Sequence, residues 1–234
     1  MIFGAGGAIG GALVERIEAS GRFAEVYAGS RRGNAEAPTG VRRFRFDLEN
    51  EPSIAAAAEA IAVPPALVIV ATGVLHDAAA GVQPEKALRQ LDAKAMAQVF
   101  ALNAIGPALI AKHFLPLLPR DRRTVFAVLS AKVGSIGDNR LGGWHSYRAS
   151  KAALNMLVKT IAVEAARTHP LAVVAALHPG TVAGPLSEPF TRGASSKTIF
   201  SPDTAAQKLL DVISNLTPAD SGGFFNWDGS RLPY

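Results

Sequence analysis

The 234-residue sequence predicts an α/β fold: a parallel, doubly wound sheet of about seven strands with helices on both faces, three layers in all. Short apolar runs alternate with longer segments of helical period along the whole chain. The runs at 66–70 and 124–129 are almost wholly apolar, as parallel strands buried on both faces are. Because no internal repeat, low-complexity tract or linker interrupts this pattern, we expect one domain over residues 1–234.

The composition narrows the chemistry. Hydrophobic residues make up 49% and charged residues 18%, which is typical of a globular chain. The absence of cysteine excludes disulfides, thiolate catalysis and Cys-ligated zinc. The five histidines show no metal-ligand spacing, and no Gly-x-Ser-x-Gly hydrolase elbow occurs, so we expect no metal site.

The charge balance and the lack of a leader indicate the cellular setting. The 24 Lys+Arg exceed the 19 Asp+Glu, but the basic residues are scattered, which favours a mildly basic surface over a nucleic-acid interface. The N-terminus has no signal-peptide pattern, and no apolar stretch approaches the roughly 20 residues of a membrane span. We therefore expect a cytoplasmic protein without nucleic-acid or membrane partners.

A glycine-rich turn follows the first apolar residues and leads into a segment of helical period. Glycines let a backbone approach a pyrophosphate, and a helix N-terminus offers free N–H groups. The spacing fits G-x-G-x-x-G only loosely, and tight turns also favour glycine. Its place between a strand and a helix nevertheless favours a Rossmann-type dinucleotide site. The predicted cofactor residues of this turn are Gly4, Gly6, Gly7, Ala8, Ile9 and Gly10.

The second strand, expected at 25–29, ends at Ser30-Arg31-Arg32. In dinucleotide folds this strand end recognises the adenosine ribose: an acidic residue accepts from the 2′-hydroxyl of NAD, whereas arginine accommodates a 2′-phosphate. No acidic residue is present here, so Ser30 and Arg31 predict NADPH in preference to NADH. The alternative is a loop with solvated charges.

The next two strand ends add further candidates. A strand at 41–46 ends at Asp47-Leu48, where Asp47 could cap the connection to a helix at 52–62 or face the adenine amino group. The buried run at 66–70 ends at Ala71-Thr72-Gly73, small residues that let a ligand lie against the carboxyl end of the strand.

The remaining elements continue the alternation. We expect helices at about 84–100 and 103–118, where Asn103 opens the second and could be simply its N-cap. Further strands are expected at 124–129, 171–177 and 222–227, and a helix at 203–215.

Tyr147 and Lys151 stand four residues apart at the start of a long segment of helical period. On a helix the two side chains share a face, and an ammonium beside a phenol would lower the pKa of that phenol. The pair suits a proton donor to a carbonyl oxygen. Taken alone, the same spacing is common on a solvated helix face.

These motifs, together with Pro179-Gly180, occur in an order that resembles the short-chain dehydrogenase/reductase family over essentially the whole chain. The segments Gly134-Ser-Ile, Gly142-Gly-Trp-His-Ser-Tyr147 and His178-Pro-Gly-Thr181 are similar to its C-factor and sniffer-type carbonyl reductase branch.

The resemblance implies an NADPH-dependent oxidoreductase that reduces an aldehyde, ketone or quinone. It implies that Tyr147 protonates the carbonyl oxygen, that Lys151 holds the nicotinamide ribose and lowers the pKa of Tyr147, and that Asn103 holds a water of a proton relay. The backbone near the nicotinamide would come from Pro179, Gly180 and Val182. The family also implies a homodimer or homotetramer.

Two positions depart from the family pattern. The catalytic serine is usually the second of a Ser-Ser pair, and here the pair reads Ser130-Ala131, so Ser130 or Ser135 would have to substitute. We favour Ser130 because it stands at the strand end. The family often has a threonine where this chain has Gly184. The missing serine leaves open an alternative, a dinucleotide-binding signalling or redox-sensing protein with little turnover.

A Pro- and Ser-containing segment at about 183–202 is predicted to cover the substrate. Its Phe190, Ile199 and Phe200 indicate an apolar carbonyl or alcohol substrate, or they are buried under the loop with no ligand role. Trp144 and His145 either line the substrate site or pack within their loop.

Overall fold

The computed structural model of the chain describes residues 1–33, 40–191 and 198–234, with the backbone alone for residues 190 and 191. Its main element is a seven-stranded parallel sheet in the order β3-β2-β1-β4-β5-β6-β9. This order turns back at β1 and β4, so the predicted doubly wound sheet is confirmed. The strands are β1 (Ile2–Phe3), β2 (Val26–Ser30), β3 (Val41–Arg45), β4 (Leu67–Val70), β5 (Thr124–Leu129), β6 (Ala172–His178) and β9 (Phe224–Asn226).

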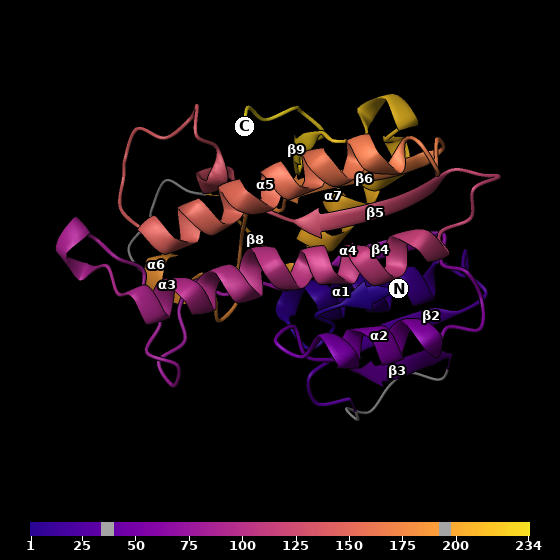
Figure 1. Cartoon of the computed structure of the whole chain (residues 1–234), viewed down its shortest axis with the longest axis horizontal. Coiled ribbons are helices and arrows are strands. Elements are labelled where there is room, and N and C mark those ends of the chain that lie inside the picture. Colours follow the sequence, from indigo (N-terminus) through magenta and orange to yellow (C-terminus); the bar gives the residue numbers. More distant parts are fainter. Residues whose placement is uncertain (34–39, 192–197) are drawn as a thin grey trace.

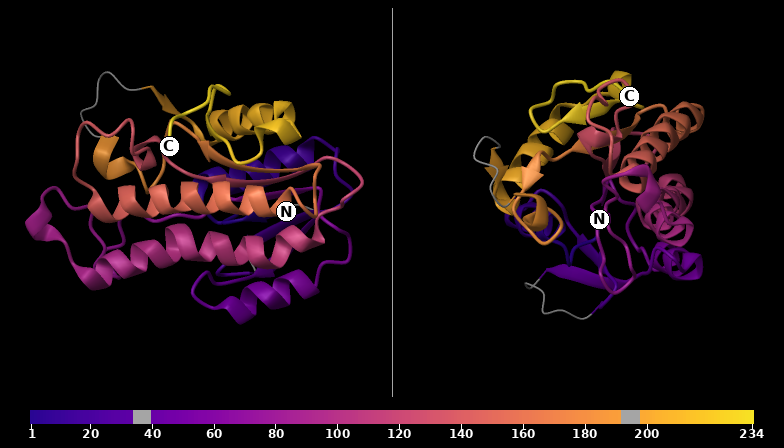
Figure 2. Two further views of the ribbon diagram at one scale, coloured as in Figure 1. Left: turned by 45° about the horizontal axis from the view of Figure 1, so that its top comes forward. Right: turned by 90° about the vertical axis from the view of Figure 1, so that its left-hand side faces the viewer.

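Helices cover both faces of the sheet, as Figures 1 and 2 show. On one face α2, the joined α3 and α4, and α5 lie side by side; α1 and α7 lie on the other. The helices are α1 (Ala8–Ala19), α2 (Glu51–Glu59), α3 (Ala93–Phe100), α4 (Gly106–Phe114), α5 (His145–Ala165), α6 (Glu188–Thr191) and α7 (Pro202–Asn215). Short 3₁₀ turns are η1 (Leu88–Gln90), η3 (Leu115–Leu117), η4 (Lys132–Gly134) and η5 (Pro218–Asp220).

The core explains why the inner strands β4 and β5 are almost wholly apolar. Along β5, Phe126 and Val128 pack toward α4 and α5, whereas Val125 and Ala127 pack toward α1 and α7. Each residue of β5 therefore faces one of two hydrophobic layers, and this strand has no position for a solvated side chain. The result is a rigid sheet whose carboxyl ends carry the polar residues of the site.

The predicted break between two helices at Asn103 is wrong. Residues Ala93–Leu117 form one continuous helical rod, in which a π turn, η2 (Ala101–Ile105), joins α3 to α4. The rod begins at residue 93 rather than 84 because Asp92 caps it, accepting from the Ala95 N–H at 2.7 Å. By length and composition alone this rod could cross a membrane, yet it lies on the sheet beside α2 and α5, as a core helix does.

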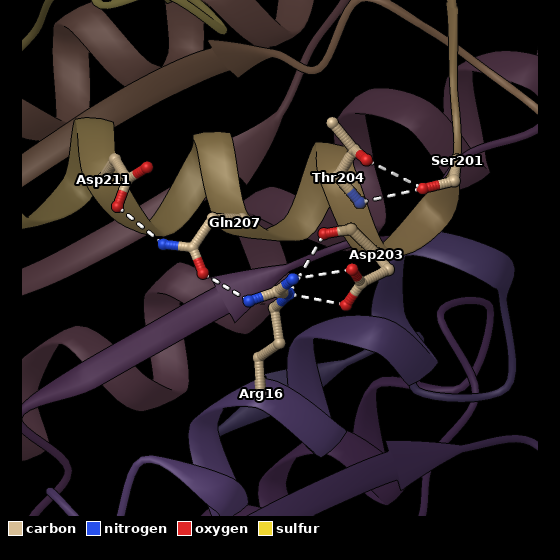
Figure 3. A network of polar contacts seen from close by, with 6 residues as sticks. All are labelled: Arg16, Ser201, Asp203, Thr204, Gln207 and Asp211. Carbon is tan, nitrogen blue, oxygen red and sulfur yellow. Dashed lines mark hydrogen bonds and ion pairs between the residues drawn. The ribbon is translucent and has the colours of Figure 1, made fainter.

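A polar network joins α1 to α7 (Figure 3). The Arg16 guanidinium donates to both carboxylate oxygens of Asp203 at 2.6 Å and also to the side chain of Gln207. Ser201 caps α7 by accepting from the Thr204 N–H at 3.0 Å. The network fixes the end of the predicted covering segment to the helix that follows the glycine turn.

A second, two-stranded sheet was not predicted. It pairs β7 (Thr181–Val182) with β8 (Ile199–Phe200), so the covering segment leaves and returns through neighbouring strands. Of the expected apolar cover, Ile199 is exposed and Phe200 packs edge-on against Trp227, with 4.9 Å between ring centroids. The side chain of Phe190 lies outside the described residues.

Candidate active site

The glycine turn between β1 and α1 is built for close backbone approach. Gly4 has φ +89°, and a Cβ there would stand 2.8 Å from the Ala71 carbonyl oxygen. A Cβ on Gly10 would stand 2.1 Å from the Gly4 carbonyl oxygen, so both positions need glycine. Gly7 is the N-cap of α1 and makes no side-chain cap bond, which leaves the first N–H groups of Ala8 and its neighbours to a ligand.

A cleft of about 650 Å³ extends from this turn along the carboxyl ends of the strands. It brings together most of the predicted cofactor residues: Gly4, Gly6, Gly7, Ser30, Arg31, Asp47, Leu48, Ala71, Thr72 and Gly73. The Thr72 hydroxyl oxygen is buried and has no hydrogen-bond partner in the described part of the chain, so it is a polar atom to which a bound ligand could bond.

Three arginines line the cleft, Arg31, Arg32 and Arg43, and we call this part its arginine end. The sequence analysis did not predict Arg43 as a site residue. Arg43 lines the cleft from β3, beside Arg31 and Arg32 from the loop after β2. The alternation of strand β3 could have revealed it, because Phe44 packs into the core while Arg43 must then face the other way.

Asp47 closes a turn, as one of its two predicted roles requires, and its contact with adenine stays a prediction. Its Oδ1 accepts from the Glu49 N–H at 3.1 Å, which closes the turn before α2, and the residue also lines the cleft.

Asn103 sits in the π turn and is fully buried. Its Oδ1 accepts from the Val74 N–H at 2.7 Å, and its Nδ2 donates to the Val74 carbonyl at 2.8 Å and to the Ser150 hydroxyl at 3.1 Å. The residue is therefore no N-cap. It joins the segment after β4 to helix α5, one residue before Lys151.

Tyr147 and Lys151 lie on the buried side of α5, with exposed fractions of 8% and 3%. The Lys151 Nζ is 6.0 Å from the centroid of the Tyr147 ring and donates to the Leu129 carbonyl at 2.9 Å. A Cβ on Gly73 would stand 3.3 Å from this Nζ and 3.4 Å from the Asn103 Oδ1. The strand end, the π turn and the α5 face thus meet at one point.

Burial sets the protonation of this pair. It raises the pKa of Tyr147 to about 12 and lowers the pKa of Lys151 to about 8. The predicted lowering of the phenol pKa by the ammonium is therefore not seen in this structure, since desolvation outweighs it. At neutral pH Tyr147 is a protonated phenol and can donate a proton.

The predicted catalytic role of Ser130 does not fit its placement. Its hydroxyl donates to the Asn155 Oδ1 at 2.7 Å, and only 4% of the residue is exposed. Ala131 instead packs against Tyr147. The Ser135 hydroxyl accepts from the Asp138 N–H at 3.2 Å. Among the described residues, no hydrogen bond joins either hydroxyl to Tyr147.

The segment after β6 closes the site. Gly180 has φ +78°, and a Cβ there would stand 2.8 Å from the Phe200 ring. Val182 is buried in β7, and Pro179 precedes the turn. At Gly184 a Cβ would stand 3.2 Å from the Ala8 Cβ, so the position that is often threonine in the resembling family faces the first turn of α1. His76, which the sequence analysis did not single out, lies 3.0 Å from the Pro185 carbonyl and links β4 to the covering segment.

Comparisons with known proteins agree with this geometry. The family model described as short chain dehydrogenase matches residues 1–194. The chain is 34% identical to the C-signal protein of Myxococcus xanthus over 148 residues, which are 63% of this chain and 84% of that protein. It spans 56% of the length of several further curated relatives.

Solved structures share the fold. The NADPH-bound carbonyl reductase from chicken fatty liver is 26% identical with a TM-score of 0.84, and the match covers 100% of this chain and 93% of that one. Carbonyl reductase Sniffer of D. melanogaster is 22% identical with a TM-score of 0.81, and covers 100% of this chain and 98% of the other. Because the family model matches residues 1–194 of its 234, the chain belongs to the short-chain dehydrogenase family of oxidoreductases.

Proposed function

We propose that this oxidoreductase is an NADPH-dependent carbonyl reductase that converts an aldehyde, ketone or quinone to an alcohol, with Tyr147 as proton donor. The observation that carries the proposal is the meeting of a buried, protonated Tyr147 with Lys151 and Asn103 beside Gly73, a residue that lines the cleft. The same cleft is also lined by arginines, and the end of β2 has no acidic residue.

The residues of the cleft fit a nicotinamide dinucleotide phosphate. The open glycine turn at Gly6 and Gly7 and the uncapped start of α1 would hold the pyrophosphate. Arg31, with Arg43 beside it, would bind the 2′-phosphate. The cofactor, when bound, supplies the hydride. The NADPH-bound state of the chicken carbonyl reductase supports this choice of cofactor by analogy.

The protein's own residues position the substrate and move the proton. Tyr147 donates from its hydroxyl to the carbonyl oxygen, which its raised pKa allows at neutral pH. The Lys151 ammonium, held on the Leu129 carbonyl, stabilises the phenolate that this donation leaves behind. We assign Asn103 the water of the relay that returns a proton toward Lys151. We also expect Pro179, Gly180 and the Val182 backbone to face the nicotinamide.

Among the described residues, neither Ser130 nor Ser135 bonds Tyr147, so the site lacks the serine hydroxyl that is usual in this family. This difference bears on the choice of substrate. Ala131, Leu75 and Tyr147 form an apolar wall where a second hydroxyl would otherwise polarise the carbonyl. We therefore expect an apolar substrate. A homodimer or homotetramer stays a prediction, which sedimentation of the purified protein would test.

The test is NADPH oxidation by the purified protein with a panel of aromatic aldehydes, ketones and quinones. Tyr147→Phe should abolish turnover and keep NADPH binding. Tyr27→Phe is the matched control, because Tyr27 is a second phenol that bonds Glu25 away from the cleft. Turnover that persists in Tyr147→Phe would contradict the proposal.

The replacement of serine by Ala131 favours a second candidate, a dinucleotide-binding signalling or redox-sensing protein with little turnover. Tight NADPH binding without turnover on any substrate of the panel would favour it. If NADH binds as well as NADPH and Arg31→Ala changes neither affinity, the cofactor assignment is wrong.

A further inference from the structure

Three consecutive residues before α5 adopt left-handed backbone conformations. Gly142 has φ 62° and Gly143 φ 64°, and Trp144 follows with φ 51° and ψ 43°. Within residues 1–33, 40–191 and 198–234, Trp144 is the one non-glycine residue with positive φ. For a residue with a bulky side chain this conformation is strained. Such strain persists only where the surroundings impose it, and it clusters at functional sites.

The surroundings of Trp144 are built to impose it. The Trp144 N–H donates to the Glu85 carbonyl at 2.5 Å. The Glu85 carboxylate, in a residue only 5% exposed, accepts from the Ser146 N–H at 3.2 Å and from the Ser146 hydroxyl. One buried residue thus fixes the backbone on both sides of the start of α5.

Arg148 holds the other side of the same turn. Its Nε donates to the carbonyls of Gly142 at 3.2 Å and Gly143 at 3.0 Å, and its Nη1 donates to the Val133 carbonyl at 3.2 Å. The guanidinium therefore ties the two left-handed glycines to the loop after β5. Together, Glu85 and Arg148 leave Trp144 little freedom to relax.

The strained turn places the Trp144 indole ring next to Tyr147, the proposed proton donor. The Trp144 ring meets the Tyr147 ring edge-on, with 6.3 Å between centroids and an interplanar angle of 76°. Tyr147 forms a hydrophobic cluster with Leu75 and Ala131, against which Trp144 and Val133 also pack, and Leu75 lines the cofactor cleft. The wall beside the phenol is thus apolar and reaches the cleft at Leu75.

We propose that Trp144 is a substrate-contacting residue that selects carbonyl compounds with a flat aromatic or conjugated group attached to the carbonyl carbon. The inference rests on the proposed function. A flat group on the carbonyl carbon would lie against the indole while its oxygen meets the Tyr147 hydroxyl. Because no serine hydroxyl orients the carbonyl, contact with the ring takes over part of that orientation.

The experiment compares benzaldehyde with cyclohexanecarboxaldehyde, which have the same number of carbon atoms but differ in flatness. We expect the full chain with NADPH to prefer benzaldehyde, measured as the ratio of the two kcat/KM values. Trp144→Asn should lower that ratio roughly 3- to 10-fold, a size typical of one aromatic contact. Trp144→Phe, the matched control, should keep most of the preference. Asparagine tolerates the left-handed region, and a thermal melt of each variant checks its folding.

A merely structural role predicts a different result. If Trp144 only shaped the turn, Trp144→Asn would lower kcat/KM for both aldehydes by the same factor and leave their ratio unchanged, which would overturn the proposal. A wild-type protein with no preference for benzaldehyde would also overturn it.

A second readout does not depend on turnover. The chain has two tryptophans, so Trp227→Phe leaves the Trp144 indole as the sole tryptophan fluorophore. With NADP⁺ present, 4-nitrobenzyl alcohol should quench this fluorescence saturably, and more strongly than it quenches Trp144→Phe, which retains Trp227 beside Gly180. Saturable quenching in a protein that reduces no carbonyl would refute the proposed function and keep the aromatic site. Absence of saturable quenching in Trp227→Phe, with carbonyl reduction intact, would refute the inference alone.

Discussion

The Tyr147 end of the site, beside Gly73, and the arginine end of the cleft are held in different ways. At the Tyr147 end the side chains are buried and joined to backbone groups: Lys151 to the Leu129 carbonyl, Asn103 to the N–H and carbonyl of Val74. At the other end Arg31 and Arg32 are exposed charges on a loop. Packing fixes the Tyr147 end, whereas the arginine end, where we propose that the 2′-phosphate binds, relies on charge. We therefore expect substitutions at the first end to affect turnover and stability, and those at the second to affect affinity in a salt-dependent way.

Lys151→Met should give the largest effect. Methionine fills the buried space but cannot stabilise a Tyr147 phenolate, so turnover should fall roughly 100-fold or more. Steady-state NADPH oxidation measures this loss, and Lys159→Met, on the same helix, is the control. Near-normal turnover in Lys151→Met would show that the buried ammonium has no part in the reaction.

The same lysine should give the stability a distinct pH dependence. Its pKa is about 8 in the folded protein against 10.5 for the free side chain, so between these values the unfolded chain binds more protons. The free energy of unfolding should rise with pH over this window, by roughly 3 kcal/mol at most. Below pH 8 Lys151 is charged in the folded protein as well, so the free energy of unfolding is reduced by the full cost of burying this ammonium.

Urea unfolding at pH 7.5, 8.5 and 9.5 measures this trend, and Lys151→Met should lack it. Above pH 10 the raised pKa of Tyr147 acts in the opposite direction, because the unfolded phenol ionises first and stability is lost as pH rises from 10 toward about 12. If the free energy of unfolding of wild type and of Lys151→Met rose with the same slope from pH 7.5 to 9.5, the trend could not be assigned to Lys151.

Asn103→Ala should destabilise the Tyr147 end by roughly 1–3 kcal/mol, because it leaves the part-buried N–H and carbonyl of Val74 without their partner. Asn50→Ala is a suitable comparison, since Asn50 is exposed and makes no cap bond through its side chain. Chemical denaturation measures both. An equal, small effect of the two substitutions would mean that the amide of Asn103 is not needed to hold the strand end against α5.

Arg31→Ala should have the smallest effect and act at the other end. We expect NADPH affinity to fall roughly 10-fold at low salt, as for the loss of one charge-assisted contact, and NADH affinity to stay unchanged. Raising the salt concentration should shrink the difference between wild type and variant, because exposed charges are screened. A loss that does not depend on salt would point to a structural role of Arg31.

The fold could be predicted because its signals are local. The buried runs of β4 and β5, the glycine turn and the Tyr147–Lys151 spacing are each visible within a few residues of sequence. The doubly wound sheet and the family could be predicted from the succession of these signals along the chain, whereas the strand order comes from the structure.

The missed features depend on contacts between distant residues. Glu85 reaches Ser146 across 61 positions, and no local pattern marks either residue as part of the start of α5. The π turn at Asn103 reads as helix in sequence, and the pairing of β7 with β8 involves strands of two residues each. The placement of Ser130 is intermediate: strand alternation puts it on the opposite face from Ala131, and only the structure reveals Asn155 as its partner.

The most direct test of the central claim is a crossed comparison of Tyr147→Phe and Arg31→Ala in one assay, with kcat at saturating NADPH and the NADPH dissociation constant measured for each. We expect Tyr147→Phe to lose turnover at unchanged NADPH affinity, and Arg31→Ala to lose NADPH affinity at unchanged kcat. If Tyr147→Phe kept its kcat, or if both substitutions changed the same quantity, the proposed division between proton donor and cofactor contact would be wrong.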